Sequence, residues 1–129
     1  MSDKKPVILC IDDDPDILSF LRIVLEAAGY VYVGAESAEA GLRAYRENGA
    51  DAVIVDLMME EVDSGTAFVR DLLALGNRAP IFMLSSVGDS LALLTDTTPL
   101  GLAGVFQKPL AREHLLSVLA AALAGARPA

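Results

Sequence analysis

Residues 7–18, "VILCIDDDPDIL", contain the local signals that decide the fold of this chain. The apolar run at residues 7–11 has the length and composition of a buried β-strand. Asp14 then supplies a helix N-cap, and Pro15 occupies the first helical position, where its missing N–H is not needed. The stretch therefore predicts a strand, an acidic turn and a helix in direct succession.

The same succession repeats along the rest of the chain. Further apolar runs of strand length lie at residues 30–35, 52–55, 81–84 and 104–107. Helices are expected from Asp14 to Gly29, from Ser37 to Gly49, over residues 64–75 and around residues 115–123. The helical residues expected to face the core are Ile17, Leu21, Val24, Leu25, Ala28, Ala38, Leu42, Tyr45, Phe68, Leu72, Leu75, Leu115, Val118, Leu119, Ala122 and Leu123. Between the last two strands we expect only a short helix near residues 90–94, because a proline and two glycines follow it.

Strands that alternate with helices, and that are apolar on both faces, are typical of a parallel sheet covered by helices on both sides. A chain of 129 residues has the size of one ordinary domain, and 53% apolar residues are enough to fill its core. We therefore expect an α/β fold, a doubly wound five-stranded parallel sheet. It should form a single domain over residues 1–129, with its core at about 5–124.

Composition and charge exclude several classes of function. A single cysteine, Cys10, and a single histidine, His114, cannot form an internal disulfide or a Cys/His zinc site. Cys10 is expected to be a small buried hydrophobe, and His114 a surface residue. The net charge of −8 disfavours direct contact with nucleic acid or anionic lipid. No export signal and no apolar stretch of the ~20 residues that span a bilayer is present, so we expect a cytoplasmic protein without a membrane partner.

Polar residues stand where the apolar runs end. These residues are Asp12, Asp13, Asp56, Ser85 and Lys108. In a doubly wound sheet the carboxyl ends of the strands lie along one edge, where ligands bind. Carboxylates that gather at such an edge either have raised pKa values or require a cation, and hard oxygen ligands suit Mg²⁺ or Mn²⁺.

A cation beside a carboxylate, a hydroxyl and a lysine forms a set of groups suited to phosphoryl transfer. Asp56 is the expected nucleophile, because it stands alone at its strand end, whereas Asp12 and Asp13 form a pair that can hold the ion. A phosphoryl group on Asp56 would add negative charge to one edge of a small domain. Such a domain would act as a switch rather than as an enzyme, catalysing only its own phosphorylation and dephosphorylation.

Four segments, "ILCIDDDPDIL", "AVIVDLMM", "PIFMLSS" and "FQKPL", carry a resemblance to a known family. In these motifs, and in their order, the chain resembles the receiver domain of bacterial two-component response regulators. The resemblance implies a flavodoxin-like sheet with strand order 2-1-3-4-5. It implies Asp56 as phosphoacceptor, with Ser85 and Lys108 binding the phosphoryl oxygens. The implied Mg²⁺ ligands are Asp13, Asp56, the backbone carbonyl of Met58 and, through water, Asp12.

The resemblance also implies partners and a mode of switching. A sensor histidine kinase or a histidine phosphotransfer protein would supply the phosphoryl group, a downstream protein would respond, and a homodimer would form through the fourth and fifth helices. Ser85 and Val105 occupy the family's switch positions, although the family usually has an aromatic residue where Val105 stands. Phe106, the next residue, should face the opposite side of the sheet.

The resemblance further implies a cis peptide bond before Pro109. Met58 occupies a position where the family has groups that guide an attacking water, and Val87 stands two residues after Ser85. Neither side chain can hydrogen-bond water, so we expect slow loss of the phosphoryl group.

Two other functions fit part of the pattern. A haloacid-dehalogenase-like phosphatase also uses Mg²⁺ and an aspartyl phosphate, but Asp16 stands where its motif has threonine or valine, and so short a chain leaves no room for a cap domain. A receiver-like docking module that is never phosphorylated would have no need of all five site residues. Within the acidic stretch, we interpret Asp14 and Asp16 as residues of the helix cap and first turn rather than as ligands.

Overall fold

The structure, a computed structural model, describes residues 5–56, 64–85 and 103–126. Met58, Val87 and the helix expected near residues 90–94 lie outside the described residues. The observed elements are β1 (Val7–Ile11), α1 (Pro15–Ala27), β2 (Val31–Ala35), α2 (Ala38–Asn48), β3 (Ala52–Asp56), α3 (Ser64–Ala74), β4 (Ile81–Ser85), β5 (Gly104–Gln107) and α5 (Arg112–Ala126).

The five strands form one parallel sheet in the order β2-β1-β3-β4-β5, which confirms the predicted fold class and strand order. The register sets Cys10 of β1 opposite Ile54 of β3. On the other side of β3, Asp56 lies opposite Leu84 of β4. Because β1 and β3 are neighbours, the chain that leaves β1 and the last residue of β3 emerge side by side at the same edge of the sheet.

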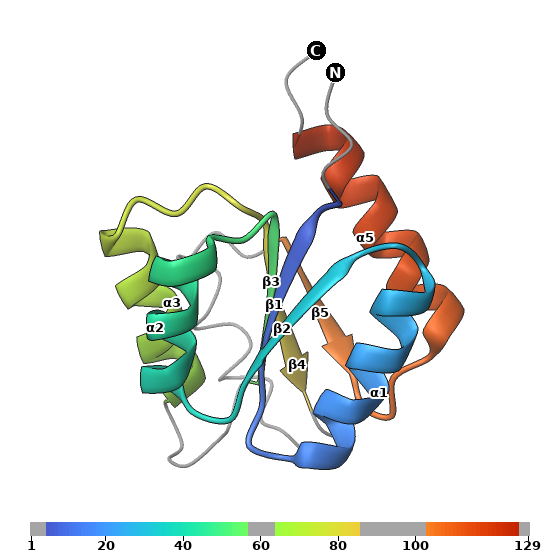
Figure 1. Cartoon of the computed structure of the whole chain (residues 1–129), viewed down its shortest axis with the longest axis horizontal. Coiled ribbons are helices and arrows are strands. Elements are labelled where there is room, and N and C mark those ends of the chain that lie inside the picture. Colours follow the sequence, from blue (N-terminus) through green and yellow to red (C-terminus); the bar gives the residue numbers. More distant parts are fainter. Residues whose placement is uncertain (1–4, 57–63, 86–102, 127–129) are drawn as a thin grey trace.

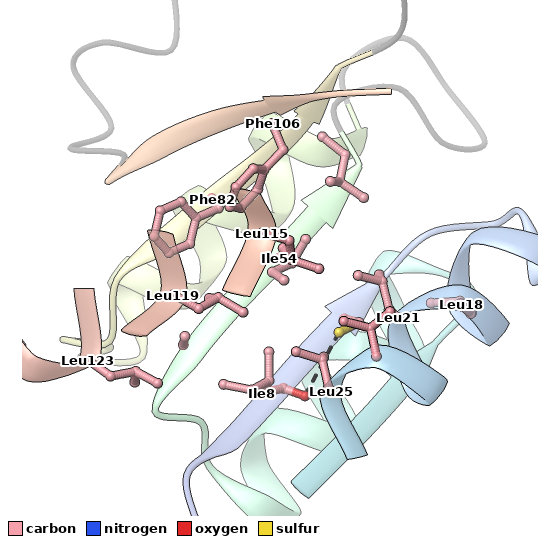
Figure 2. Packing of buried hydrophobic residues seen from close by; sticks show 14 residues of the cluster. Ile8, Leu18, Leu21, Leu25, Ile54, Phe82, Phe106, Leu115, Leu119 and Leu123 are labelled. Carbon is pink, nitrogen blue, oxygen red and sulfur yellow. Dashed lines mark hydrogen bonds between the residues drawn. The ribbon is translucent and has the colours of Figure 1, made fainter. Parts of the chain in front are cut away.

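Helices cover both faces of the sheet, with α1 and α5 on one side and α2 and α3 on the other (Figure 1). Each face has its own apolar core, because successive residues of a strand point to opposite faces. Figure 2 shows the core beneath α1 and α5, where Leu21 and Leu115 point from the helices toward the strands. Phe68 and Leu72 of α3 belong to the core on the opposite face. The strand ends are thus held in place from both sides.

Helix α1 begins as the sequence predicts. Asp14 is its N-cap, Pro15 is its first residue, and the buried residues of the helix include Leu21 and Leu25. The prediction that Ala28 faces the core is wrong, because Ala28 is the C-cap of α1 and is exposed. Gly29 follows with a φ of 93°, so the chain turns away before the helical period can continue.

The end of α3 contains a second correction. The helical period predicts Leu75 on the buried stripe, but α3 ends at Ala74 and Leu75 is 44% exposed. The N–H of Leu75 still donates to the carbonyls of Asp71 and Leu72, and Gly76 follows with a φ of 89°. The chain leaves the helix at this turn, so a helical period extended through Leu75 places its side chain on the wrong side.

Helix α2 packs closely against the sheet at Gly41. A Cβ atom added to Gly41 would lie 2.8 Å from Cγ1 of Ile11 and 2.9 Å from Cε1 of Phe68. Only a residue without a side chain allows this approach of α2 to β1 and α3. The contact helps to fix the last residue of β1, directly before the acidic turn.

Two expectations for single residues are confirmed. Cys10 is fully buried, and burial raises the pKa of its thiol far above the ordinary value. His114 is exposed near the start of α5, where its ring stacks edge-on against Phe106 with 5.7 Å between the ring centroids. Among the helices described, none has the length and apolar character needed to cross a membrane.

Candidate functional site

Five of the predicted site residues come together at the carboxyl-terminal edge of the sheet. They are Asp12, Asp13, Asp56, Ser85 and Lys108, placed by the ends of β1, β3, β4 and β5. Asp12, Asp56 and Ser85 have exposed fractions of only 0%, 5% and 3%, whereas Asp13 is exposed. The edge therefore combines buried polar groups with one carboxylate that is open to solvent.

The ammonium of Lys108 lies between the two buried carboxylates. Its Nζ atom is 3.0 Å from Oδ2 of Asp12 and 3.5 Å from Oδ1 of Asp56, and 18% of the lysine side chain is exposed. Burial by itself lowers the pKa of Lys108, but the neighbouring Asp12 and Asp56 carboxylates outweigh it and raise that pKa above its ordinary value. Lys108 is therefore positively charged throughout the neutral range.

The carboxylate of Asp12 is held in one orientation. The backbone N–H of Asp12 donates to the carbonyl of Ala35 over 3.1 Å, and its Oδ1 accepts the backbone N–H of Asp14 over 2.9 Å. Oδ2 is buried, and within the described part of the chain no donor is aligned for a hydrogen bond to it, although the ammonium of Lys108 stands at ion-pair distance. Oδ2 is thus the oxygen of Asp12 that remains available to a second cation.

Three carboxylates at this edge can converge on one ion. Asp12, Asp13 and Asp56 can each offer an oxygen so that the three atoms lie within 4.8 Å of one another. A set made only of oxygen ligands, two buried and one exposed, fits Mg²⁺ or Mn²⁺ and leaves room for water ligands. The incompletely satisfied Oδ2 of Asp12 supports the same assignment.

The end of β5 ties Lys108 to β4. The backbone N–H of Lys108 donates to the carbonyl of Ser85 over 2.7 Å, and the bond between Lys108 and Pro109 is cis, as expected. Phe106 is buried with 2% exposure, whereas Val105 is 44% exposed. The prediction that these two neighbours face opposite sides of the sheet is confirmed, and Val105 is an exposed aliphatic residue at the position that the resemblance implies as a switch.

This arrangement has a definite chemical capacity. A group attached to Asp56 would lie beside the ammonium of Lys108, whose Nζ is already 3.5 Å from Oδ1. Ser85 adds a hydroxyl donor at the end of the neighbouring strand. A carboxylate nucleophile with an ammonium and a hydroxyl close by can stabilise the negative charge of a transferred phosphoryl group.

The sequence did not predict the contact between Asp14 and Asp12. The sequence indicates Asp14 only as the cap of α1, yet in the structure its N–H donates to Oδ1 of Asp12. The spacing of two residues in "DDD" was the available signal, because an aspartate commonly accepts the backbone N–H two residues further on. The cap of α1 is therefore connected to the site.

Comparisons with known proteins point to one family. The family model described as "Response regulator receiver domain" matches residues 8–120. The transcriptional regulatory protein GlrR of Escherichia coli is 33% identical over 129 residues, which cover 100% of this chain and 29% of GlrR. The response regulator protein TodT of Pseudomonas putida is 32% identical over 123 residues, covering 95% of this chain and 53% of TodT. The chain thus spans about a third to a half of the length of these relatives.

Solved structures share the fold over nearly the whole chain. The chemotaxis protein CheY4 of Vibrio cholerae superposes with a TM-score of 0.84 at 26% identity, covering 92% of this chain and 99% of CheY4. A response regulator receiver domain protein from Clostridium thermocellum gives a TM-score of 0.83 at 28% identity, with 93% and 95% of the two chains covered. The range that the family model matches, residues 8–120, contains all five site residues of this edge.

Proposed function

This chain belongs to the family of response regulator receiver domains of two-component systems, and we propose that it acts as a switch controlled by phosphorylation of Asp56. One observation carries the proposal: Asp56 ends β3 within 3.5 Å of the Lys108 ammonium and beside two further carboxylates. A buried nucleophile, a fixed cation and a candidate site for a mobile cation are thereby combined at one edge. The receiver then acts as a signalling domain whose chemistry is limited to its own aspartate.

We assign Mg²⁺ as the cofactor, with Mn²⁺ as a substitute. Asp12, Asp13 and Asp56 would hold it, together with the backbone carbonyl of Met58 that the family resemblance implies. When bound, the ion supplies positive charge that offsets the developing charge on the phosphoryl oxygens. The three carboxylates thus serve to bring that charge to the edge of the sheet.

The residues of the chain divide the transfer step between them. A carboxylate oxygen of Asp56 forms the new O–P bond while the bond from phosphorus to the donor breaks, and the electron pair of that bond leaves with the donor. The ammonium of Lys108 offsets the charge on the transferred oxygens, and the hydroxyl of Ser85 donates a hydrogen bond to one of them. The product carries additional negative charge at a site where Asp12 and Asp13 are already charged.

The proposed partners follow from the family and from this chemistry. A sensor histidine kinase or a histidine phosphotransfer protein in the cytoplasm is the proposed donor, because a phosphorylated imidazole is a good phosphoryl donor to a carboxylate. A downstream protein, or another part of a longer chain, would recognise the phosphorylated form. The acidic domain itself, with its net charge of −8, is not assigned a nucleic-acid contact.

The central test is phosphorylation by a small acyl phosphate in the presence of Mg²⁺, read out by intact mass. We expect one phosphoryl adduct per chain, lost when EDTA is added beforehand and absent in the Asp56→Asn variant. Asp71→Asn, which changes an exposed carboxylate on α3, is the matched control and should be phosphorylated normally. An adduct that persists in the Asp56→Asn variant would contradict the assignment.

The same reaction separates the receiver from the phosphatase alternative. A receiver gives a single stoichiometric adduct, whereas a phosphatase releases phosphate from a small ester over many turnovers. Continuous phosphate release that depends on Asp12 rather than on Asp56 would overturn the proposed function.

A further inference from the structure

We propose that Asp14 is a positioning residue, which orients the carboxylate of Asp12 for the cation. The inference rests on the proposed function, because it assigns Asp14 a part in the same site without making it a ligand. Asp14 makes hydrogen bonds in two directions. Its backbone N–H donates to Oδ1 of Asp12 over 2.9 Å, and its side-chain Oδ1 accepts the N–H of Asp16 over 2.9 Å. A single residue therefore joins the cation site to the first turn of α1.

The backbone of Asp14 is constrained on its helical side. Its φ and ψ are −92° and 109°, an extended conformation that the following Pro15 favours. Its carbonyl accepts the N–H of Leu18 over 3.2 Å, which begins the hydrogen-bond ladder of α1. The helix is in turn fixed by Leu21 and Leu25, which are fully buried. The direction of the Asp14 N–H is therefore set by the core through the helix cap.

The consequence for Asp12 is a division of roles between its two oxygens. Oδ1 is occupied by the Asp14 N–H, so the carboxylate presents Oδ2 to the ammonium of Lys108 at 3.0 Å and to an incoming ion. A carboxylate without this contact would rotate over a broad range about its last torsion. Binding an ion would then have to fix that rotation, at the expense of affinity.

The negative charge of Asp14 is a different explanation for an effect on cation binding. Two substitutions at position 14 distinguish it from the orientation of Asp12. The Asp14 side chain is exposed, so its negative charge could attract a cation without any part in orientation. Asn removes that charge but keeps a side-chain oxygen able to cap the helix, whereas Ala removes both. If Asp14 orients Asp12, only the Ala variant should bind Mg²⁺ more weakly. If its charge alone matters, the two variants should lose the same affinity for Mg²⁺.

The experiment compares Mg²⁺ binding by calorimetry for the wild-type chain, Asp14→Asn, Asp14→Ala and Ser37→Ala. Ser37 caps α2 through a hydrogen bond from the Ala40 N–H over 3.1 Å, so its variant loses a helix cap that makes no contact with Asp12. We expect Asp14→Ala to bind Mg²⁺ about tenfold more weakly than Asp14→Asn, as is usual when a partner of a metal ligand is lost. Ser37→Ala should bind as the wild type does. Equal losses in the two Asp14 variants, or an equal loss in Ser37→Ala, would overturn the proposal.

A second readout requires no metal. In EDTA, the backbone amide at position 14 should be protected from hydrogen exchange in the wild type and in Asp14→Asn, and unprotected in Asp14→Ala. Protection that is unchanged in Asp14→Ala would overturn the positioning role. If the wild-type chain binds no Mg²⁺, the proposed cation site fails, but the amide measurement still decides whether Asp14 orients Asp12.

Discussion

Replacing Lys108 by Met should destabilise the metal-free protein more than replacing an exposed charged residue does. The variant keeps an unbranched side chain of similar length but removes the ammonium that lies 3.0 Å from Asp12 Oδ2 and 3.5 Å from Asp56 Oδ1. Both carboxylates are buried, and water cannot readily replace the lost charge. The variant therefore removes the positive charge that faces both carboxylates.

The magnitude follows from these distances. At an effective dielectric constant of 20, the two contacts correspond to attractions of about 5.5 and 4.7 kcal/mol before any desolvation is counted. Removing one partner of a buried ion pair typically costs about 3–5 kcal/mol, and the 18% exposure of the lysine favours the lower end of that range. We expect a loss of about 3 kcal/mol in the free energy of unfolding. The exposed Arg22, paired with Glu26 at 3.6 Å, provides the control variant Arg22→Met, which should lose less than about 1 kcal/mol.

Urea unfolding followed by circular dichroism measures the free energy of unfolding of each variant, once in EDTA and once in saturating Mg²⁺. The difference between Lys108→Met and the wild type should shrink in Mg²⁺, because the ion brings positive charge back to Asp12 and Asp56 and binds only the folded state. A Lys108→Met variant as stable as Arg22→Met in EDTA would refute the electrostatic argument. If Mg²⁺ leaves the loss in free energy of unfolding unchanged, the lysine stabilises the fold through packing instead.

Four further predictions concern other parts of the chain. Asp13→Asn should raise the free energy of unfolding in EDTA by up to about 1 kcal/mol, because it relieves like-charge repulsion, and should reduce the gain that Mg²⁺ gives the wild type in the same urea titrations. Burial raises the pKa of Cys10, so its contribution to stability is complete below the unfolded thiol pKa and declines as the pH rises above it. The slope of unfolding free energy between pH 9 and 10 should be steeper than in Cys10→Ala, by up to about 1.4 kcal/mol per pH unit. Gly41→Ala should cost about 1–3 kcal/mol in urea unfolding, because its Cβ would lie 2.8 Å from a buried isoleucine; an unchanged midpoint would show that α2 can shift at no cost. The phosphorylated wild type, freed of donor, should lose its phosphoryl group more slowly than Met58→Asn, measured by intact mass over time; a half-life of minutes or less would contradict the expectation.

The sequence predicted those parts of the fold and site that depend on local pattern. Apolar runs located the five strands, and the pair Asp14-Pro15 located the start of α1 correctly. The errors at Ala28 and Leu75 arose because a helical period carries no information about the residue at which the backbone leaves the helix. The strand order itself came from the family resemblance rather than from the patterns.

The ion pair between Lys108 and Asp12 illustrates what local patterns cannot show. It joins residues that are far apart in the sequence, so it depends on which strands are neighbours and on the path of the chain after β5. The sequence indicated that a lysine and several carboxylates would share one edge. It could not indicate that the ammonium stands closer to Asp12 than to Asp56.

The charge balance of the site explains why neighbouring substitutions should have opposite signs. Among the described residues, three carboxylates and one ammonium leave the edge with a net charge of about −2, gathered where two of the carboxylates are buried. Removing the ammonium makes this imbalance worse, whereas removing the exposed carboxylate of Asp13 reduces it. A divalent cation would compensate this charge, and the proposed phosphorylation of Asp56 would make the edge negative again, though less so than before the cation bound. Two apolar cores fix the strands that carry these residues. We therefore expect the exposed Asp13 and the partly exposed Lys108, rather than the strands, to respond to a change in charge. The proposed switch would therefore come at a cost in stability, and the Asp13→Asn and Lys108→Met variants measure that cost from opposite directions.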